Sequence, residues 1–488
     1  MTSSLQHRPT SVRQRLDKDI PAFLRPLIRA YILGYATSIT PRILTLVLRQ
    51  YAASRKNRGA DGLTQPTIST SLLHILRGGL ELQRFPTFCA LLVGGTTFLE
   101  TPLFVVISRL ASRLKPLDRQ RLSRFLSSLF AAWCGLKLLQ SKQSDAFTDK
   151  TPVESDDAQP RRVQYRTTEY AGRTLDLTLF AFTRAFDVIV GELWARRHRT
   201  GSRPWAQVDA GISKLADPSM FAISCGFIMW SWFYYPSRLP RAYSQWISTA
   251  AAVDDRLIEA LRRCRKGELR YGEDTGQAPL LEAMARDYGW PMEWGDPAKT
   301  IPYPCEMVHM GCGPSCEYHF LSRFVRSFKW SMTTYLPLNL LLVARNPKLK
   351  AVKAALISAS RSSAFLAAFI TLYFYGVCLA RSRIGPHLFG KDAVSRTKID
   401  AGICVGTGSF LCGWSILLEA SGRRKDMALF VAPRAIATLF PRRYAMDKQW
   451  QETTVFAFST AVVFTCVLEN QKRVRGVFGK ILAKVLIP

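Results

Sequence analysis

The chain has 488 residues and a formal net charge of +31, with 67 Lys and Arg against 36 Asp and Glu. Such an excess of positive charge is typical of nucleic-acid-binding proteins when it clusters on a base-reading module. Here no such module is recognisable, and the basic residues flank apolar stretches, as Arg109 and Arg113 or Arg381 and Arg383 do. Membrane proteins place basic residues in this way, against anionic lipid headgroups. The composition therefore argues against nucleic acid as a partner and favours membrane lipids.

Four uncharged apolar stretches predict helices that span a membrane, which requires about 20 mostly apolar residues. They are Pro218–Tyr235, Ser363–Ala380, Ala401–Leu418 and Thr453–Leu468. Four further stretches are apolar but carry charges: Phe85–Ser108, Leu122–Leu139, Leu175–Leu193 and Met427–Phe440. Each is predicted as a further membrane helix, and the alternative is a buried helix of the soluble type or a helix end whose charged side chains snorkel to the interface. The first twenty residues contain no apolar core and predict no cleavable secretory signal. Insertion is therefore expected to rely on the internal helices.

A short motif recurs in two of the charged stretches. Residues 179–185 (LFAFTRA) and 429–435 (LFVAPRA) place an Arg-Ala pair at the same position. The order of helices around each copy also recurs, and each series opens with an amphipathic stretch, near Phe23 or Phe320, for which a solvated surface helix is the alternative. The sequence thus predicts an all-α, polytopic transmembrane helical bundle with two repeated four-helix halves, each preceded by an amphipathic helix.

The predicted segments follow from this repetition. Residues 1–84 form an N-terminal tail with the first amphipathic helix, and residues 85–242 form the first transmembrane half. Residues 243–319 are a polar linker with a Cys/His-rich motif, and residues 320–488 hold the second amphipathic helix and the second half. Within that half, Gly402, Gly406 and Gly413 lie on one helical face. Small residues permit close helix approach in lipid, so this face predicts helix packing and not a ligand site.

Five charges are predicted to lie within the membrane: Glu100, Arg184, Asp187, Glu419 and Arg434. An arginine near the centre of a membrane helix costs about 2.5–3.5 kcal/mol on insertion scales and normally faces protein or water. We therefore expect both arginines to point into the bundle. Asp187, one turn further along the same helix as Arg184, and the two glutamates are the candidate partners.

A cluster of cysteines and histidines precedes the second amphipathic helix. Cys305, His309, Cys312, Cys316 and His319 offer five ligands of the kind that suits zinc. Their spacing is not that of a standard zinc finger, and three interpretations stay open: a structural metal site, a disulfide or redox pair, and packing of a tight turn. We expect the segment to be compact, to anchor the following helix and to bring Cys305 near Cys316. No other cofactor is predicted.

The same region resembles the transmembrane protein 135 family. The likeness rests on Pro304-Cys305, Pro314-Ser315-Cys316 and Tyr335–Leu338, continues through Ile416–Glu419, Arg423-Arg424 and Ala428–Phe440, and covers roughly residues 305–470. The first half shares Val93-Gly94-Gly95 and the repeated motif more weakly. The resemblance implies a multi-spanning protein of peroxisomes and mitochondria that is associated with organelle division, with fatty-acid and sterol handling and with energy balance. It also implies a distant similarity to pore-forming import translocases of the mitochondrial inner membrane.

Three functions follow as hypotheses. The first is a non-enzymatic organelle membrane protein of membrane dynamics or lipid homeostasis, which fits the lack of nucleotide-binding or hydrolase motifs. The second is a transporter or channel for a lipid or small metabolite, which the paired halves and membrane charges favour. The third is a membrane enzyme built on the Cys/His cluster, for which the sequence offers no convincing general base. Homo-oligomers or other membrane proteins are the expected protein partners.

Overall fold

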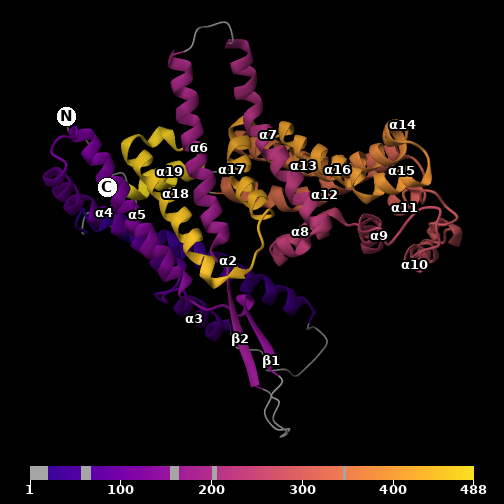
Figure 1. The fold of residues 1–488 in the computed structure, drawn as a ribbon, viewed down its shortest axis with the longest axis horizontal. Coiled ribbons are helices and arrows are strands. Elements are labelled where there is room, and N and C mark those ends of the chain that lie inside the picture. Colours follow the sequence, from indigo (N-terminus) through magenta and orange to yellow (C-terminus); the bar gives the residue numbers. More distant parts are fainter. Residues whose placement is uncertain (1–19, 57–67, 154–163, 201–205, 345–347, 488) are drawn as a thin grey trace. The chain divides into compact units, whose positions relative to one another are not determined.

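The computed structural model describes residues 20–56, 68–153, 164–200, 206–344 and 348–487 (Figure 1). Helices make up most of these residues, which confirms the predicted all-α class. The chain divides into two compact units, the first of Met1–Gly201 with Arg443–Pro488 and the second of Ser202–Arg442. Each unit therefore has its own core.

The first unit is built around α4 and α18. Its helices are α2 (Arg25–Lys56), α3 (Ile68–Gly78), α4 (Phe85–Leu110), α5 (Pro116–Gln140), α6 (Leu175–Thr200), α18 (Gln449–Glu469) and α19 (Gly476–Leu486), with short 3-10 turns at Asp145–Phe147, Met446–Lys448 and Gln471–Arg473. Helix α4 packs against α2 and α5, and α18 packs against α5 and α6. Phe88, Leu136 and Phe456 are buried where α4, α5 and α18 meet.

The first unit also contains a small antiparallel sheet. It consists of β1 (Thr148–Val153), β2 (Gln164–Ala171) and β3 (Tyr444–Ala445) in the order β1-β2-β3. Thr148 pairs with Glu169, and Tyr170 pairs with Ala445. The third strand lies just before α18, so the sheet fixes the entry of α18 into the unit.

The second unit is built around α13. Its long helices are α7 (Ala206–Tyr234), α12 (Cys316–Val343), α13 (Leu349–Cys378) and α17 (Ser421–Ala437), and the short α16 (Cys404–Cys412) packs among them. Shorter elements are α8 (Arg241–Ala251), α9 (Asp255–Lys266), α10 (Ala278–Tyr288), α11 (Cys305–Val308), α14 (Gly385–Phe389), α15 (Ala393–Lys398) and the 3-10 turns Pro236–Arg238, Met292–Gly295 and Gly413–Leu418. Helix α13 packs against α12 and α16, and α7 packs against α16 and α17.

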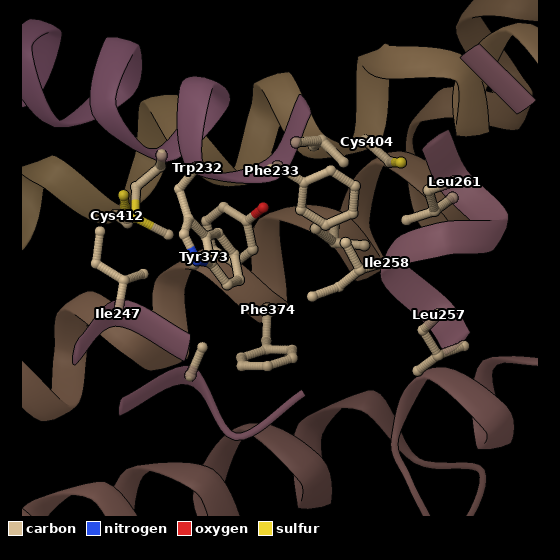
Figure 2. Packing of buried hydrophobic residues seen from close by; sticks show 14 of the residues in the cluster. Trp232, Phe233, Ile247, Leu257, Ile258, Leu261, Tyr373, Phe374, Cys404 and Cys412 are labelled. Atoms are coloured by element: carbon tan, nitrogen blue, oxygen red, sulfur yellow. The ribbon is translucent and has the colours of Figure 1, made fainter. Parts of the chain in front are cut away.

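The segment predicted as a polar linker folds onto this second unit. In Figure 2, Trp232 of α7 and Tyr373 of α13 face the apolar side chains of α8 and α9. The two rings lie 6.4 Å apart between centroids, and the Trp232 indole donates a hydrogen bond to Ser248 Oγ at 3.1 Å. Leu257 and Leu261 of α9 are buried in the same cluster. The charged residues of α9 thus occupy one face, and its apolar face belongs to the core.

Six helices in the described part of the chain are long and apolar enough to span a membrane. They are Arg25–Leu48, Phe85–Leu110, Pro116–Gln140, Leu349–Arg383, Ala393–Leu418 and Met446–Glu469. The first was expected to be an amphipathic interfacial helix. The stretch Pro218–Tyr235 is helical within α7 but is not among the six, because its Trp and Tyr residues lower the mean hydropathy. The chain is therefore a multi-pass membrane protein by the length and composition of its helices.

The compact units do not coincide with the two predicted transmembrane halves. Helix α7, which was assigned to the first half, packs in the second unit, whereas α18, assigned to the second half, packs in the first. Each half therefore contributes its last helix to the other unit.

Glycines permit the closest helix contacts of the second unit. A Cβ atom on Gly413 would overlap Ala222 of α7, and one on Gly376 would lie 2.7 Å from the Cα of Gly408. Gly402 and Gly406 both approach the Trp230 ring of α7. The predicted glycine face is thus a packing face, as membrane helices use small residues.

Candidate functional site

The Cys/His segment is a tight turn between two helices. Helix α11 ends at Val308, and Met310, Gly311 and Gly313 then adopt positive φ values of 52°, 82° and 81°. Glycine takes up this left-handed conformation at little cost, which explains two of the three positions. Ser315 caps the next helix, because its hydroxyl accepts a hydrogen bond from the Tyr318 amide at 3.2 Å. The turn therefore brings the start of α12 close to α11.

Three of the five predicted ligands meet at this turn. One ligand atom from each of Cys305, His309 and Cys316 lies within 4.8 Å of the other two. The expected proximity of Cys305 and Cys316 is thus present. Cys312 and His319 lie outside this group of three.

His319 has a different place from the one expected of a ligand. Its ring stacks on that of His309, with centroids 4.5 Å apart and planes 15° from parallel. Burial lowers the pKa of His319 to about 3, and the nearby His309 and Arg323 lower it further in the same direction. His319 is therefore neutral at physiological pH and supports the His309 ring by packing.

Cys378, the last residue of α13, completes the cluster from another part of the chain. Its Sγ lies 3.5 Å from His309 Nε2. His309 Nδ1 lies 2.8 Å from the Gly313 carbonyl oxygen. Because a carbonyl oxygen only accepts hydrogen bonds, Nδ1 carries the proton and Nε2 presents its lone pair to the sulfur atoms. Cys378 lies in the predicted membrane stretch Ser363–Ala380 and was not among the five predicted ligands.

The sulfur atoms of this cluster interact with one another. A hydrogen bond from Cys378 lowers the pKa of the Cys316 thiol to about 5, and the neighbouring His309 contributes to the shift. Cys305 Sγ lies 2.6 Å from Ser382 Oγ, in the turn that follows α13. The hydrogen bond from Cys378 and the nearby His309 thus favour the thiolate form of Cys316, which is the form that binds metals.

A buried ion pair lies directly beyond Cys378. Arg381 sits in the π-helical turn Leu379–Arg383 and Asp400 in the π-helical turn Ile399–Ile403. Their side chains are each 2% exposed and are joined by two hydrogen bonds of 2.6 and 2.9 Å. The Tyr271 hydroxyl donates to Asp400 at 2.6 Å, and the guanidinium lies 4.0 Å from the Tyr303 ring centroid. Arg381 was expected to face lipid headgroups, and that expectation was wrong.

The five predicted membrane charges occupy separate places. Glu100 pairs with Arg124 at 2.8 Å, Asp187 with Arg475, and Glu419 with Arg423 at 2.7 Å. Arg184 lies 5.1 Å from the Phe180 ring centroid and 5.2 Å from that of Phe478. Arg434 lies 5.2 Å from Phe430 and 5.0 Å from Tyr243. The three carboxylates thus have arginine partners that the sequence did not suggest, and both motif arginines pack on aromatic rings.

Each copy of the repeated motif borders an apolar cavity of about 290 Å³. In the first unit the motif residues Phe180, Ala181 and Arg184 line the cavity, together with Phe88 and Phe464 and other side chains of α2, α4, α18 and α19. In the second unit the residues at the same motif positions, Phe430 and Val431, line it with side chains of α7, α8 and α13.

The fold and these sites define a multi-pass, all-helical membrane protein with a Cys/His cluster and two apolar cavities. Comparisons with protein-family models, with curated proteins and with solved structures find no match.

Proposed function

We propose that the protein is a non-enzymatic, multi-pass membrane protein that binds lipid in its two apolar cavities. The observation that carries this proposal is the equivalence of the cavities: both have about the same volume, and both are lined by the residues at the Phe and Ala/Val positions of the repeated motif. Cavities lined by apolar and aromatic side chains favour acyl chains or sterols over polar metabolites. Arg184 lines the first cavity, and its planar guanidinium suits a carboxylate or phosphate headgroup.

The packing of helices supports two repeated units with exchanged last helices. In the first unit the neighbours follow the order α2, α4, α5, α18 and α6, and in the second the order α12, α13, α16, α7 and α17. Each motif helix, α6 or α17, thus packs on the exchanged helix, α18 or α7. In both, the arginine lies over the phenylalanine four residues earlier, at 5.1 and 5.2 Å. A duplication that kept a lipid cavity in each unit accounts for these parallels.

The cellular role follows from the resemblance to the transmembrane protein 135 family. We place the protein in a peroxisomal or mitochondrial membrane, where binding of fatty acids or sterols serves lipid homeostasis or membrane dynamics. Imaging of a tagged chain against markers of both organelles tests this assignment. A plasma-membrane signal alone contradicts it.

The alternative is a transporter or channel for a lipid or small metabolite, which the two similar units favour. In the sequence, the predicted membrane charges counted as support for transport. That support is weaker in the structure, because Glu100, Asp187 and Glu419 each have an arginine partner close by. A flux assay in liposomes separates the two functions. Lipid binding without flux supports the binding protein, and flux that is abolished when a tryptophan at Ala181 or Val431 fills a cavity supports the transporter.

The cavities are tested by filling them. The purified protein in nanodiscs is expected to retain about two lipids per chain in native mass spectrometry, one for each cavity. Ala181→Trp fills the first cavity and Val431→Trp the second, so each is expected to lower the number to about one. Val190→Trp and Ile223→Trp place the same ring at exposed positions and serve as controls. Retained lipid in both cavity variants refutes the proposed sites.

A further inference from the structure

We propose that Cys305, His309, Cys316 and Cys378 form a tetrahedral binding site for a structural zinc ion. The set differs from the one that the sequence predicts, because Cys378 replaces Cys312 and His319. Three thiolates and one imidazole are a recognised donor set for structural zinc.

The distances between these donors suit a single ion. With Zn–S near 2.3 Å and Zn–N near 2.0–2.1 Å, the sulfur-to-nitrogen edge of a tetrahedron is about 3.6 Å. Cys378 Sγ and His309 Nε2 lie 3.5 Å apart, which matches this edge. The donors of Cys305, His309 and Cys316 lie within 4.8 Å of one another, and Cys378 joins this group through its hydrogen bond with Cys316.

The surroundings orient the histidine as metal sites require. A zinc-bound histidine usually donates its second ring N–H to a carbonyl or carboxylate, which fixes the tautomer. Here Nδ1 donates to the Gly313 carbonyl at 2.8 Å, so Nε2 is directed at Cys378. The His319 ring stacks on the His309 ring, with centroids 4.5 Å apart, and limits its rotation. The histidine is thus held for binding before any ion arrives.

Zinc at this site links two parts of the second unit. Cys305, His309 and Cys316 come from α11 and the start of α12, whereas Cys378 ends α13 next to the turn that carries Arg381. Four protein donors leave no open position, which is the mark of a structural and not a catalytic zinc. The ion would therefore fasten the Cys/His turn to the end of α13.

Metal content tests the proposal on the full-length protein purified in detergent with reductant. We expect about one zinc per chain by elemental mass spectrometry, a loss of most of it in Cys378→Ser, and full retention in Cys312→Ser. Cys312 lies in the same turn outside the donor group and is the matched control. No zinc in the parent protein after incubation with Zn²⁺, or equal loss in the two variants, overturns the proposal.

Two measurements on the unaltered protein cover the case in which Cys378→Ser does not fold. Cobalt substitution is expected to give the absorption of a tetrahedral site, with thiolate-to-metal charge transfer of the intensity that three sulfur ligands produce. Thiol alkylation is expected to modify Cys312 but not Cys305 until a chelator is added, since both are partly exposed. A disulfide among Cys305, Cys316 and Cys378, or alkylation of Cys305 unaffected by metal, excludes the zinc site.

Discussion

The two units handle charges within apolar helices in opposite ways. In the first unit, Arg124 and Glu100 pair between α5 and α4 with side chains that are 19% and 26% exposed. In the second unit, Arg381 and Asp400 are 2% exposed and are enclosed by Tyr271 and Tyr303. The first pair keeps access to solvent or headgroups, whereas the second depends wholly on its protein surroundings.

The difference comes from the segment between α7 and α12. Tyr271 and Tyr303 belong to this segment, and they supply the hydrogen bond and the ring face that the buried pair requires. Arg381 and Asp400 each lie in a π-helical turn, and the two side chains meet. Such turns are rare in proteins as a whole, and many of those that occur lie at functional sites. A charge within an apolar helix thus marks either an accessible pair or a polar core, and the covering segment decides which.

Breaking the buried pair is expected to have the largest effect. Asp400→Asn leaves the Arg381 charge buried without its counterion, and this should lower the free energy of unfolding by about 3–5 kcal/mol. Replacing both residues, as Arg381→Met with Asp400→Leu, should restore most of the loss because no charge then remains buried. Denaturation in mixed micelles measures both variants.

The control for this prediction is the exposed pair Arg383–Glu317, whose side chains are 57% and 58% exposed. Glu317→Gln should change the stability by no more than about 1 kcal/mol. If Asp400→Asn is as mild as Glu317→Gln, the contrast between enclosed and accessible pairs does not hold.

Glycine-to-alanine substitutions compare how tightly helices pack in the two units, and their expected effects on stability are smaller. Gly413→Ala places a Cβ atom against the backbone of Ala222, which cannot yield easily, so overpacking should cost about 1–3 kcal/mol. Gly94→Ala in the first unit meets side-chain atoms of Leu27, the nearest being Cδ1 at 2.6 Å, and should cost less because a side chain moves more easily than backbone. Gly422→Ala meets no atom within 4 Å and serves as the neutral control. Thermal unfolding in detergent should rank the three variants in this order, and a reversed order contradicts the packing argument.

The sequence predicted features that depend on local residues. Long apolar runs identified the helices of both units, because a membrane helix satisfies its backbone hydrogen bonds within itself. The segment with Cys305 and Cys316 was expected to be compact, and Gly311 and Gly313 form a tight turn between these two cysteines.

Features that depend on packing between helices far apart in the chain could not be predicted from the sequence. Cys378 joins the cluster only because α13 packs against α12, and no local pattern distinguishes it from the other cysteines of apolar stretches. The partner of Glu100 is Arg124 because α4 packs against α5, which the sequence did not reveal. The placement of α7 in the second unit and of α18 in the first was equally hidden, since both are apolar helices that fit either unit by composition.

The motif arginines test whether the two units are equivalent. Arg184→Leu and Arg434→Leu each remove a cation–π contact with the preceding phenylalanine, at 5.1 and 5.2 Å, and such contacts contribute about 0.5–2 kcal/mol. We expect both variants to lose stability by a similar amount in denaturation measurements. Arg184→Lys and Arg434→Lys keep the charge and should lose less. A loss confined to one arginine contradicts the equivalence of the units.

The smallest expected effect concerns an accessible charge of the first unit and its pH dependence. Hydrogen bonds from Arg84 and then Lys142 lower the pKa of Glu81 from its usual 4.5 to about 2. Because the folded-state pKa lies below the unfolded one, the stabilisation is complete above about pH 4.5 and is lost as the pH falls toward 2. Glu81→Gln should therefore make the free energy of unfolding depend less on pH below about pH 4.5. Near pH 7 it should lower the free energy of unfolding only by the small amount expected of a surface ion pair. Asp274→Asn, a change at another exposed carboxylate, serves as the control, because it leaves the Glu81 contacts in place. Chemical denaturation at pH 7, 5 and 3 measures the difference. An acid dependence that is the same in Glu81→Gln and the parent protein shows that the contacts of Glu81 with Arg84 and Lys142 contribute nothing to the stability of the fold.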